Sequence, residues 1–111
     1  MPIQSITAFE SIDGTQALAV TATASAFPTK LGANTSVVRL FNSGTATMFI
    51  SFNKVSATAV TNCVVPTAGS AQKSFPLPPY ALEVLTIPAG NFIAAISATA
   101  GTLYVTEGRG I

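Results

Sequence analysis

Short runs of β-branched and aromatic residues, separated by Gly, Pro and Asn, dominate the 111-residue sequence. Runs of this kind between turn-forming residues are typical of β-strands. No stretch repeats apolar residues at the period of about 3.6 residues that marks an amphipathic helix, with capping residues at its ends. We therefore expect an all-β chain with little helix.

The clearest pair of runs covers residues 36–41 and 46–52, joined by Asn42-Ser43-Gly44-Thr45. Asn and Gly tolerate the left-handed backbone of tight turns, so this pattern predicts a β-hairpin. Alternation along the two strands predicts which side chains face the core: Val38, Leu40, Met48, Ile50 and Phe52. Phe41 and Phe49 should then be at least partly exposed, as an aromatic pair on one sheet face.

A second cluster, residues 80–87, 92–98 and 102–106, is divided by turn-type residues and predicts a three-stranded meander. Residues 3–9, 18–24 and 57–65 are candidate further strands. Seven or eight short antiparallel strands in one domain of residues 1–111 indicate a two-layer β-sandwich or jelly roll. Residues 1–14 are a possible extended N-terminal arm, and the glycine-containing tail 107–111 should be mobile unless a partner holds it.

Charged residues make up only 8% of the chain, with a net charge of +1, whereas soluble domains carry about 25%. Its five basic residues are scattered, which argues against nucleic-acid binding. The chain has no His, four widely spaced carboxylates and a single Cys, Cys63, in an apolar run. We therefore expect no enzyme activity, metal site or cofactor, and an inert, buried thiol. Pro and Gly interrupt the uncharged segment 84–106, so strands explain it better than a membrane span.

A chain so poor in charge should be sparingly soluble alone, so we expect a homo-oligomer, either a trimer or a dimer. The proline-rich loop 75–80 is either a stiff contact arm or a crossover that covers its own core. Residues of this loop, the two aromatic side chains and the tail form the candidate interface: Phe41, Phe49, Phe75, Pro76, Leu77, Pro78, Pro79, Tyr80, Arg109 and Ile111.

Two groups of residues carry a resemblance to a known class of proteins. They are residues 37–46, followed by an aromatic strand, and residues 83–90, 92–96 and 103–108. Together, over about residues 36–111, they resemble small virion proteins of tailed bacteriophages, most closely head decoration (cement) proteins. The resemblance implies a β-sandwich, made in the host cytoplasm, that binds the major capsid protein on the outer capsid surface and reinforces the head.

Two other functions stay open. The chain could be another virion component, such as a head-completion, tail or fibre-associated module, which copy number in the particle would distinguish. A surface- or carbohydrate-binding module would need exposed aromatic side chains lining a groove, and the sequence contains no Trp.

Overall fold

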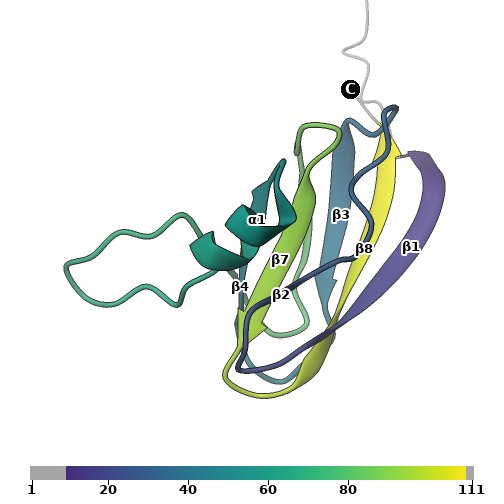
Figure 1. The fold of residues 1–111 in the computed structure, drawn as a ribbon. Coiled ribbons are helices and arrows are strands. Elements are labelled where there is room, and N and C mark those ends of the chain that lie inside the picture. The colour runs from purple at the N-terminus through teal and green to yellow at the C-terminus, as the bar shows by residue number, and fades with distance from the viewer. Residues whose placement is uncertain (1–9, 110–111) are drawn as a thin grey trace, which may run out of the picture.

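The computed structural model describes residues 10–109, which form eight strands and one short helix (Figure 1). The strands make two four-stranded antiparallel sheets packed as a β-sandwich, which confirms the predicted fold class. The elements are β1 (Glu10–Val20), β2 (Ser25–Ala26), β3 (Val37–Asn42), β4 (Met48–Asn53), α1 (Ser56–Asn62), β5 (Phe75–Leu77), β6 (Leu82–Leu85), β7 (Phe92–Ser97) and β8 (Gly101–Arg109). The predicted strand 3–9 lies outside the described residues.

Strands that follow one another along the chain mostly belong to different sheets. Sheet A has the order β1-β8-β3-β6, and sheet B has the order β2-β7-β4-β5. Within residues 10–109, only the connection from β4 to β5 stays in one sheet. The predicted hairpin of residues 36–52 and the predicted meander of residues 80–106 are therefore wrong, although strands occur at those places. Alternation reports which side chains face the core, but it does not report which strands pair.

The segment between β3 and β4 is a corner from one sheet to the other. Asn42 is fully buried, and its Nδ2 donates to the carbonyl oxygens of Ala46 and Leu77, each at 2.9 Å. Its Oδ1 accepts a hydrogen bond from the Gly44 N–H at 2.8 Å. Gly44 in turn packs closely on Gly101, because a Cβ added to Gly101 would lie 2.9 Å from the Gly44 Cα. The Asn and Gly that suggested a hairpin turn thus build a buried corner.

The core lies between the two sheets and receives side chains from both. It contains Val20, Phe27, Leu31, Val38, Leu40, Met48, Ile50, Leu77, Ile87, Ile93, Ala95, Leu103 and Val105. Four of the five core predictions for β3 and β4 are confirmed, but Phe52 is 37% exposed. Ser51 is buried instead, because α1 covers the outer face of sheet B and Ser51 Oγ donates to the Ala59 carbonyl. Phe52 lies at the margin, with its ring edge-on to Phe75.

The helix α1 occupies part of the segment 57–65 that the sequence pattern assigns to a strand. Seven residues make only about two turns, too few for an apolar period to be visible. Ala59 and Cys63, four residues apart, are buried together against Ala94 of β7. Small side chains allow this close approach, and Ala favours helix. In Figure 1 the helix lies beside β4 and β7, on the opposite side of the sandwich from β1 and β8.

Both ends of the described chain belong to sheet A. β1 and β8 pair from Glu10–Arg109 to Val20–Gly101, with a register shift between Ser11 and Thr15. Residues 10–14 of the expected N-terminal arm therefore lie in β1, and residues 1–9 fall outside the described part. Residues 107–109 of the expected mobile tail complete β8, because pairing with both β1 and β3 fixes them.

Candidate interaction surface

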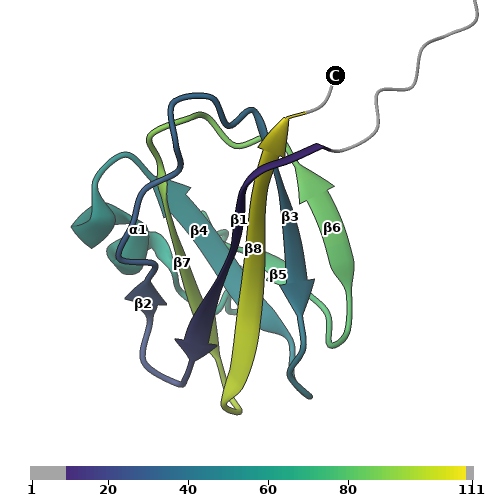
Figure 2. The same ribbon diagram turned by 90° about the vertical axis from the view of Figure 1, so that its right-hand side faces the viewer.

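The outer face of sheet A carries a row of apolar side chains that no described element covers, with Arg39 and Thr106 opposite each other beside that row. One cross-strand row, Ala17–Tyr104–Phe41–Leu82, runs across all four strands. Tyr104 is 39% exposed and Leu82 is 55% exposed, and Val84 beside this row is 51% exposed. Figure 2 shows β1, β8, β3 and β6 toward the viewer with none of the described elements in front of them. We call the surface formed by this row and Val84 the open face.

The open face contrasts with the outer face of sheet B, which α1 covers. Exposed apolar side chains that gather on one face mark interaction sites more often than single exposed ones. The sequence pattern missed Leu82, Val84 and Tyr104 as surface residues. Alternation in residues 82–87 places Leu82 and Val84 on one side of the strand. The other side is also apolar, so the pattern does not indicate which side faces the core. Only the pairing of β6 with β3 shows that Leu82 and Val84 face outward.

The predicted aromatic pair is divided between the two sheets. Phe41 and Phe49 are both half-buried, as expected. Phe41 lies on the open face and stacks on Tyr104, with 6.4 Å between ring centroids. Phe49 lies in β4, and its carbonyl oxygen accepts a hydrogen bond from the Cys63 thiol that follows α1. The two rings therefore do not share one face, because β3 and β4 do not pair.

The proline-rich loop 75–80 is held within its own fold. Leu77 is fully buried in the core, so its place in the candidate interface is wrong. Its carbonyl oxygen accepts from Asn42 Nδ2, and the Tyr80 N–H donates to the Asn42 carbonyl at 2.7 Å. Phe75 is half-buried and packs against the same core. The loop therefore covers its own core, as a short edge strand beside β4.

Four residues of that loop keep some access to solvent. Pro76 and Pro78 are exposed, and Pro79 is half-buried. Tyr80 is 64% exposed and adopts a φ of 59°, in the left-handed region that side chains other than Gly seldom occupy. The hydrogen bonds around Asn42 hold this strained conformation, so Tyr80 presents its ring outward next to the start of β6.

Two residues near the C-terminal end of the sequence, Arg109 and Ile111, were predicted to belong to the interface. Arg109 is exposed at the end of β8, where it pairs in register with Glu10, and Ile111 lies outside the described residues. Glu107, which the sequence placed in a mobile tail, is 4% exposed and accepts three hydrogen bonds. The donors are Gln16 Nε2 at 3.0 Å, the Gly32 N–H at 2.8 Å and Thr35 Oγ1 at 2.9 Å. Glu107 thus ties β1 and the loop before β3 to β8.

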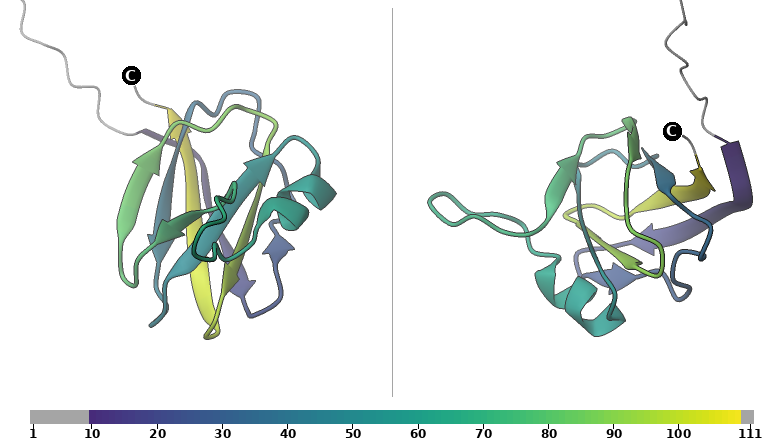
Figure 3. Two further views of the ribbon diagram at one scale, coloured as in Figure 1. Left: turned by 90° about the vertical axis from the view of Figure 1, so that its left-hand side faces the viewer. Right: turned by 90° about the horizontal axis from the view of Figure 1, so that it is seen from above.

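A second protruding feature is the segment 64–73 between α1 and β5, which we call the finger. All ten residues are exposed, and the segment extends away from the sandwich in Figure 1 and in the right-hand view of Figure 3. Thr67 and Ser70 pair across its tip, where Gly69 has a φ of 80°. At its base, Ser74 Oγ donates to the Val64 carbonyl. The finger offers a polar tip and two exposed valines, Val64 and Val65, near its base.

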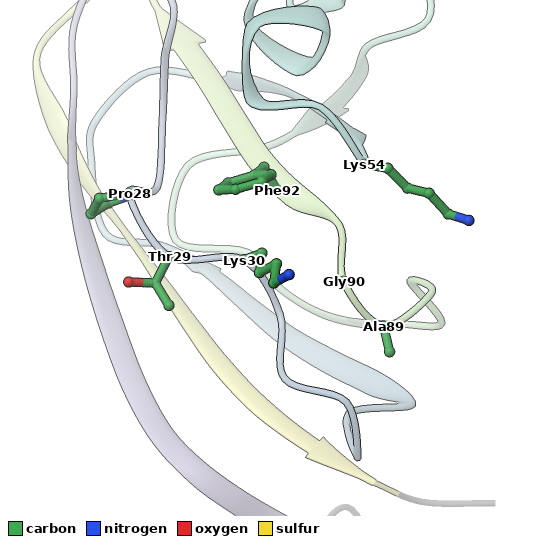
Figure 4. A pocket seen from close by; sticks show the side chains of 7 residues that line it. All are labelled: Pro28, Thr29, Lys30, Lys54, Ala89, Gly90 and Phe92. Atoms are coloured by element: carbon green, nitrogen blue, oxygen red, sulfur yellow. The ribbon is translucent and has the colours of Figure 1, made fainter.

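A shallow hollow of about 700 Å³ lies beside the start of β7, lined by Pro28, Thr29, Lys30, Lys54, Ala89, Gly90 and Phe92. In Figure 4, Lys30 lies between Phe92 and Ala89, whereas Lys54 extends away from Phe92. With two lysines and no acidic residue among its lining residues, the hollow favours anionic groups. Both lysines are exposed, so a charge there is well screened, and the open face is the better defined surface.

Glu83 and Glu107, the acidic residues whose side chains the structure describes, lie apart from each other. Glu83 lies on the edge strand β6 and Glu107 on β8, with β3 between them. Cys63 is buried, and burial raises the pKa of its thiol above the ordinary value, partly offset by hydrogen bonding with Ser51. Over residues 10–109, no three His, Cys, Asp or Glu side chains gather as a metal site would require. No helix in that part of the chain has the length and apolar character of a membrane span.

Comparisons with protein families, with curated proteins and with solved structures found no match to this chain.

Proposed function

We propose that this protein is a structural component of a phage virion that binds the outer surface of the capsid and stabilises the head. The open face is the observation that best supports this role. It presents Phe41, Leu82, Val84 and Tyr104 to solvent across three neighbouring strands. The major capsid protein is proposed as the partner on the strength of the resemblance of residues 36–111 to head decoration proteins alone.

The proposed mechanism is binding energy alone. A protein that binds an assembled capsid but not its separated subunits stabilises the assembly by mass action, by about 2.7 kcal/mol per site at a hundredfold excess over Kd. Apolar side chains contribute about 25 cal/mol for each Å² removed from water. Leu82, Val84 and Tyr104 lie on the same outer face of sheet A, so a single partner surface can cover them together.

The direct test is the position of the protein in purified virions, determined by cryo-electron microscopy. The proposal expects density on the outer capsid surface, in a copy number that follows the capsid lattice. A copy number that follows the single portal vertex or the tail would instead identify a head-completion or tail component. Absence from particles would reject both.

A binding experiment tests the role of the open face. Val84→Lys places a second positive charge directly opposite Arg39 on this face and should weaken binding to capsids that lack the protein by at least about tenfold, since burying an unpaired charge is costly. Thr58→Lys is the matched control, because Thr58 is exposed on α1, on the opposite outer face. Equal binding by the two variants would remove the open face from the contact.

A further inference from the structure

The outer edge of β1 has no neighbouring strand among residues 10–109. β1 is the terminal strand of sheet A and pairs only with β8 among the described strands. An edge strand directs half of its backbone N–H and C=O groups away from its sheet, where they can pair with another strand. Proteins usually block such edges with Lys, Pro or very short strands. β1 has eleven residues, and its part from Gly14 to Val20 contains no charge and no Pro.

The uncharged stretch of β1 is symmetric about one residue. The register shift between Ser11 and Thr15 limits the regular ladder at one end, and Val20 is the last residue of β1 at the other. The uncharged residues of β1 run from Gly14 to Val20 and have Ala17 at their midpoint, and the regular ladder with β8 covers Thr15 to Val20 of them. An antiparallel pair of two identical strands is related by a two-fold axis, and a charge near the axis would meet its own copy. This stretch carries none.

The side chains along β1 also suit a neighbouring strand. Thr15, Ala17 and Ala19 point to the open face, are small and are exposed. Gln16 and Leu18 point to the core side and are only half-buried, because nothing described flanks them beyond β1. A second β1 would cover both of them.

We propose that β1 pairs with β1 of a second copy of this chain, antiparallel and about a two-fold axis at Ala17. In this register Ala17 faces Ala17, and Thr15 faces Ala19 of the second copy. Sheet A of each copy then continues into the other as one eight-stranded sheet, and the two open faces lie on the same side. The proposal concerns the isolated protein and does not depend on the capsid role.

Disulfide trapping tests the register. Residues directly opposite in antiparallel strands have Cα atoms about 4.5–5.5 Å apart, within the range of about 4.4–6.8 Å that a disulfide spans. Ala17→Cys should therefore form a covalent dimer under mild oxidation. Thr102→Cys is the matched control, on the next strand opposite Ala19. Three strand spacings would separate the two introduced thiols, at least about 14 Å. The unsubstituted protein shows whether Cys63, which is buried, forms any disulfide by itself.

Sedimentation equilibrium tests the interaction without a cross-link. The unsubstituted protein should form a dimer. Ala17→Lys should raise the Kd of that dimer at least about tenfold, because two ammonium groups then lie close together at the axis. Added salt should screen this repulsion and lower the Kd of the variant again. Val84→Lys, on the far edge of the open face, should leave the Kd within about twofold. Circular dichroism checks that each variant is folded.

A monomer at every concentration, or trapping of Thr102→Cys as efficient as that of Ala17→Cys, would overturn the proposal. A dimer weakened by Val84→Lys but not by Ala17→Lys would overturn it too, in favour of contact through the open face. These outcomes are independent of the virion experiment, because a dimer absent from particles contradicts only the capsid role, and a monomer found on particles contradicts only the edge pairing.

Discussion

Replacing Glu107 is expected to test how the loop before β3 is held in place. The side chain of Glu107 is 4% exposed and accepts hydrogen bonds from Gln16, the Gly32 backbone and Thr35. In Glu107→Ala all three donors lose their acceptor. Gln16 is half-buried and can turn to water, but Thr35 is buried, with 3% of the residue exposed, and the Gly32 N–H is fixed by the main chain.

The expected cost follows from those two donors. An unsatisfied buried polar group costs about 1–3 kcal/mol, so with two such donors Glu107→Ala should lower the free energy of unfolding by about 2–6 kcal/mol. Glu107→Gln keeps one acceptor oxygen for Gly32 and Thr35, and the Gln16 amide can turn its oxygen toward the new amide. That variant loses mainly the strengthening that a charged acceptor gives, about 1 kcal/mol per bond, and should be destabilised by about 1–2 kcal/mol.

Urea unfolding of the three proteins at pH 7 measures these differences, with Glu83→Ala as the control for loss of an exposed carboxylate. The control should change stability by less than about 0.5 kcal/mol. Amide hydrogen exchange at Gly32 should accelerate in Glu107→Ala, because its N–H loses its acceptor. A Glu107→Ala protein within about 0.5 kcal/mol of the unsubstituted one, with unchanged exchange at Gly32, would show that these hydrogen bonds do not hold the loop.

Two further predictions concern the core and the thiol. Gly101→Ala should lower stability by about 1–3 kcal/mol, because the added Cβ would lie 2.9 Å from the Gly44 backbone; unchanged urea unfolding would contradict the close packing. Burial raises the pKa of Cys63 in the folded state, so the fold favours the protonated thiol. Its contribution is fully present below the unfolded pKa, ordinarily about 9.0, and is lost as pH rises through the folded value. Stability should therefore fall more steeply between pH 8 and about 10 in the unsubstituted protein than in Cys63→Ala, and parallel curves would contradict this.

The sequence was sufficient for the fold class, because strand-forming runs and turn residues are local signals. It also identified Val38, Leu40, Met48 and Ile50 as core residues through their alternation. Strand pairing was not predictable in the same way. The Asn42–Thr45 segment has the composition of a hairpin turn, and only the partners of Asn42 in space, the carbonyls of Ala46 and Leu77, make it a corner.

The surface was less predictable than the core. Leu77 stands in a proline-rich loop that has the composition of a contact arm, and its burial depends on pairing with Met48 of β4. Glu107 stands among glycines near the sequence end, and its burial depends on donors about 70 to 90 residues earlier in the chain. Such contacts between distant segments leave no local signature. The open face likewise requires knowing that β6 lies beside β3.

The position of β8 has a consequence for how the molecule is made. β8 follows every other described strand along the chain, yet it lies between β1 and β3 in sheet A. While the polypeptide emerges from the ribosome, the strand that lies between β1 and β3 has not yet been made. The backbone groups of β1 and β3 that bond to β8 therefore stay unpaired until β8 is synthesised. Sheet A therefore closes only after synthesis has reached residue 109, and ribosome-bound nascent chains stalled before residue 101 should remain sensitive to protease.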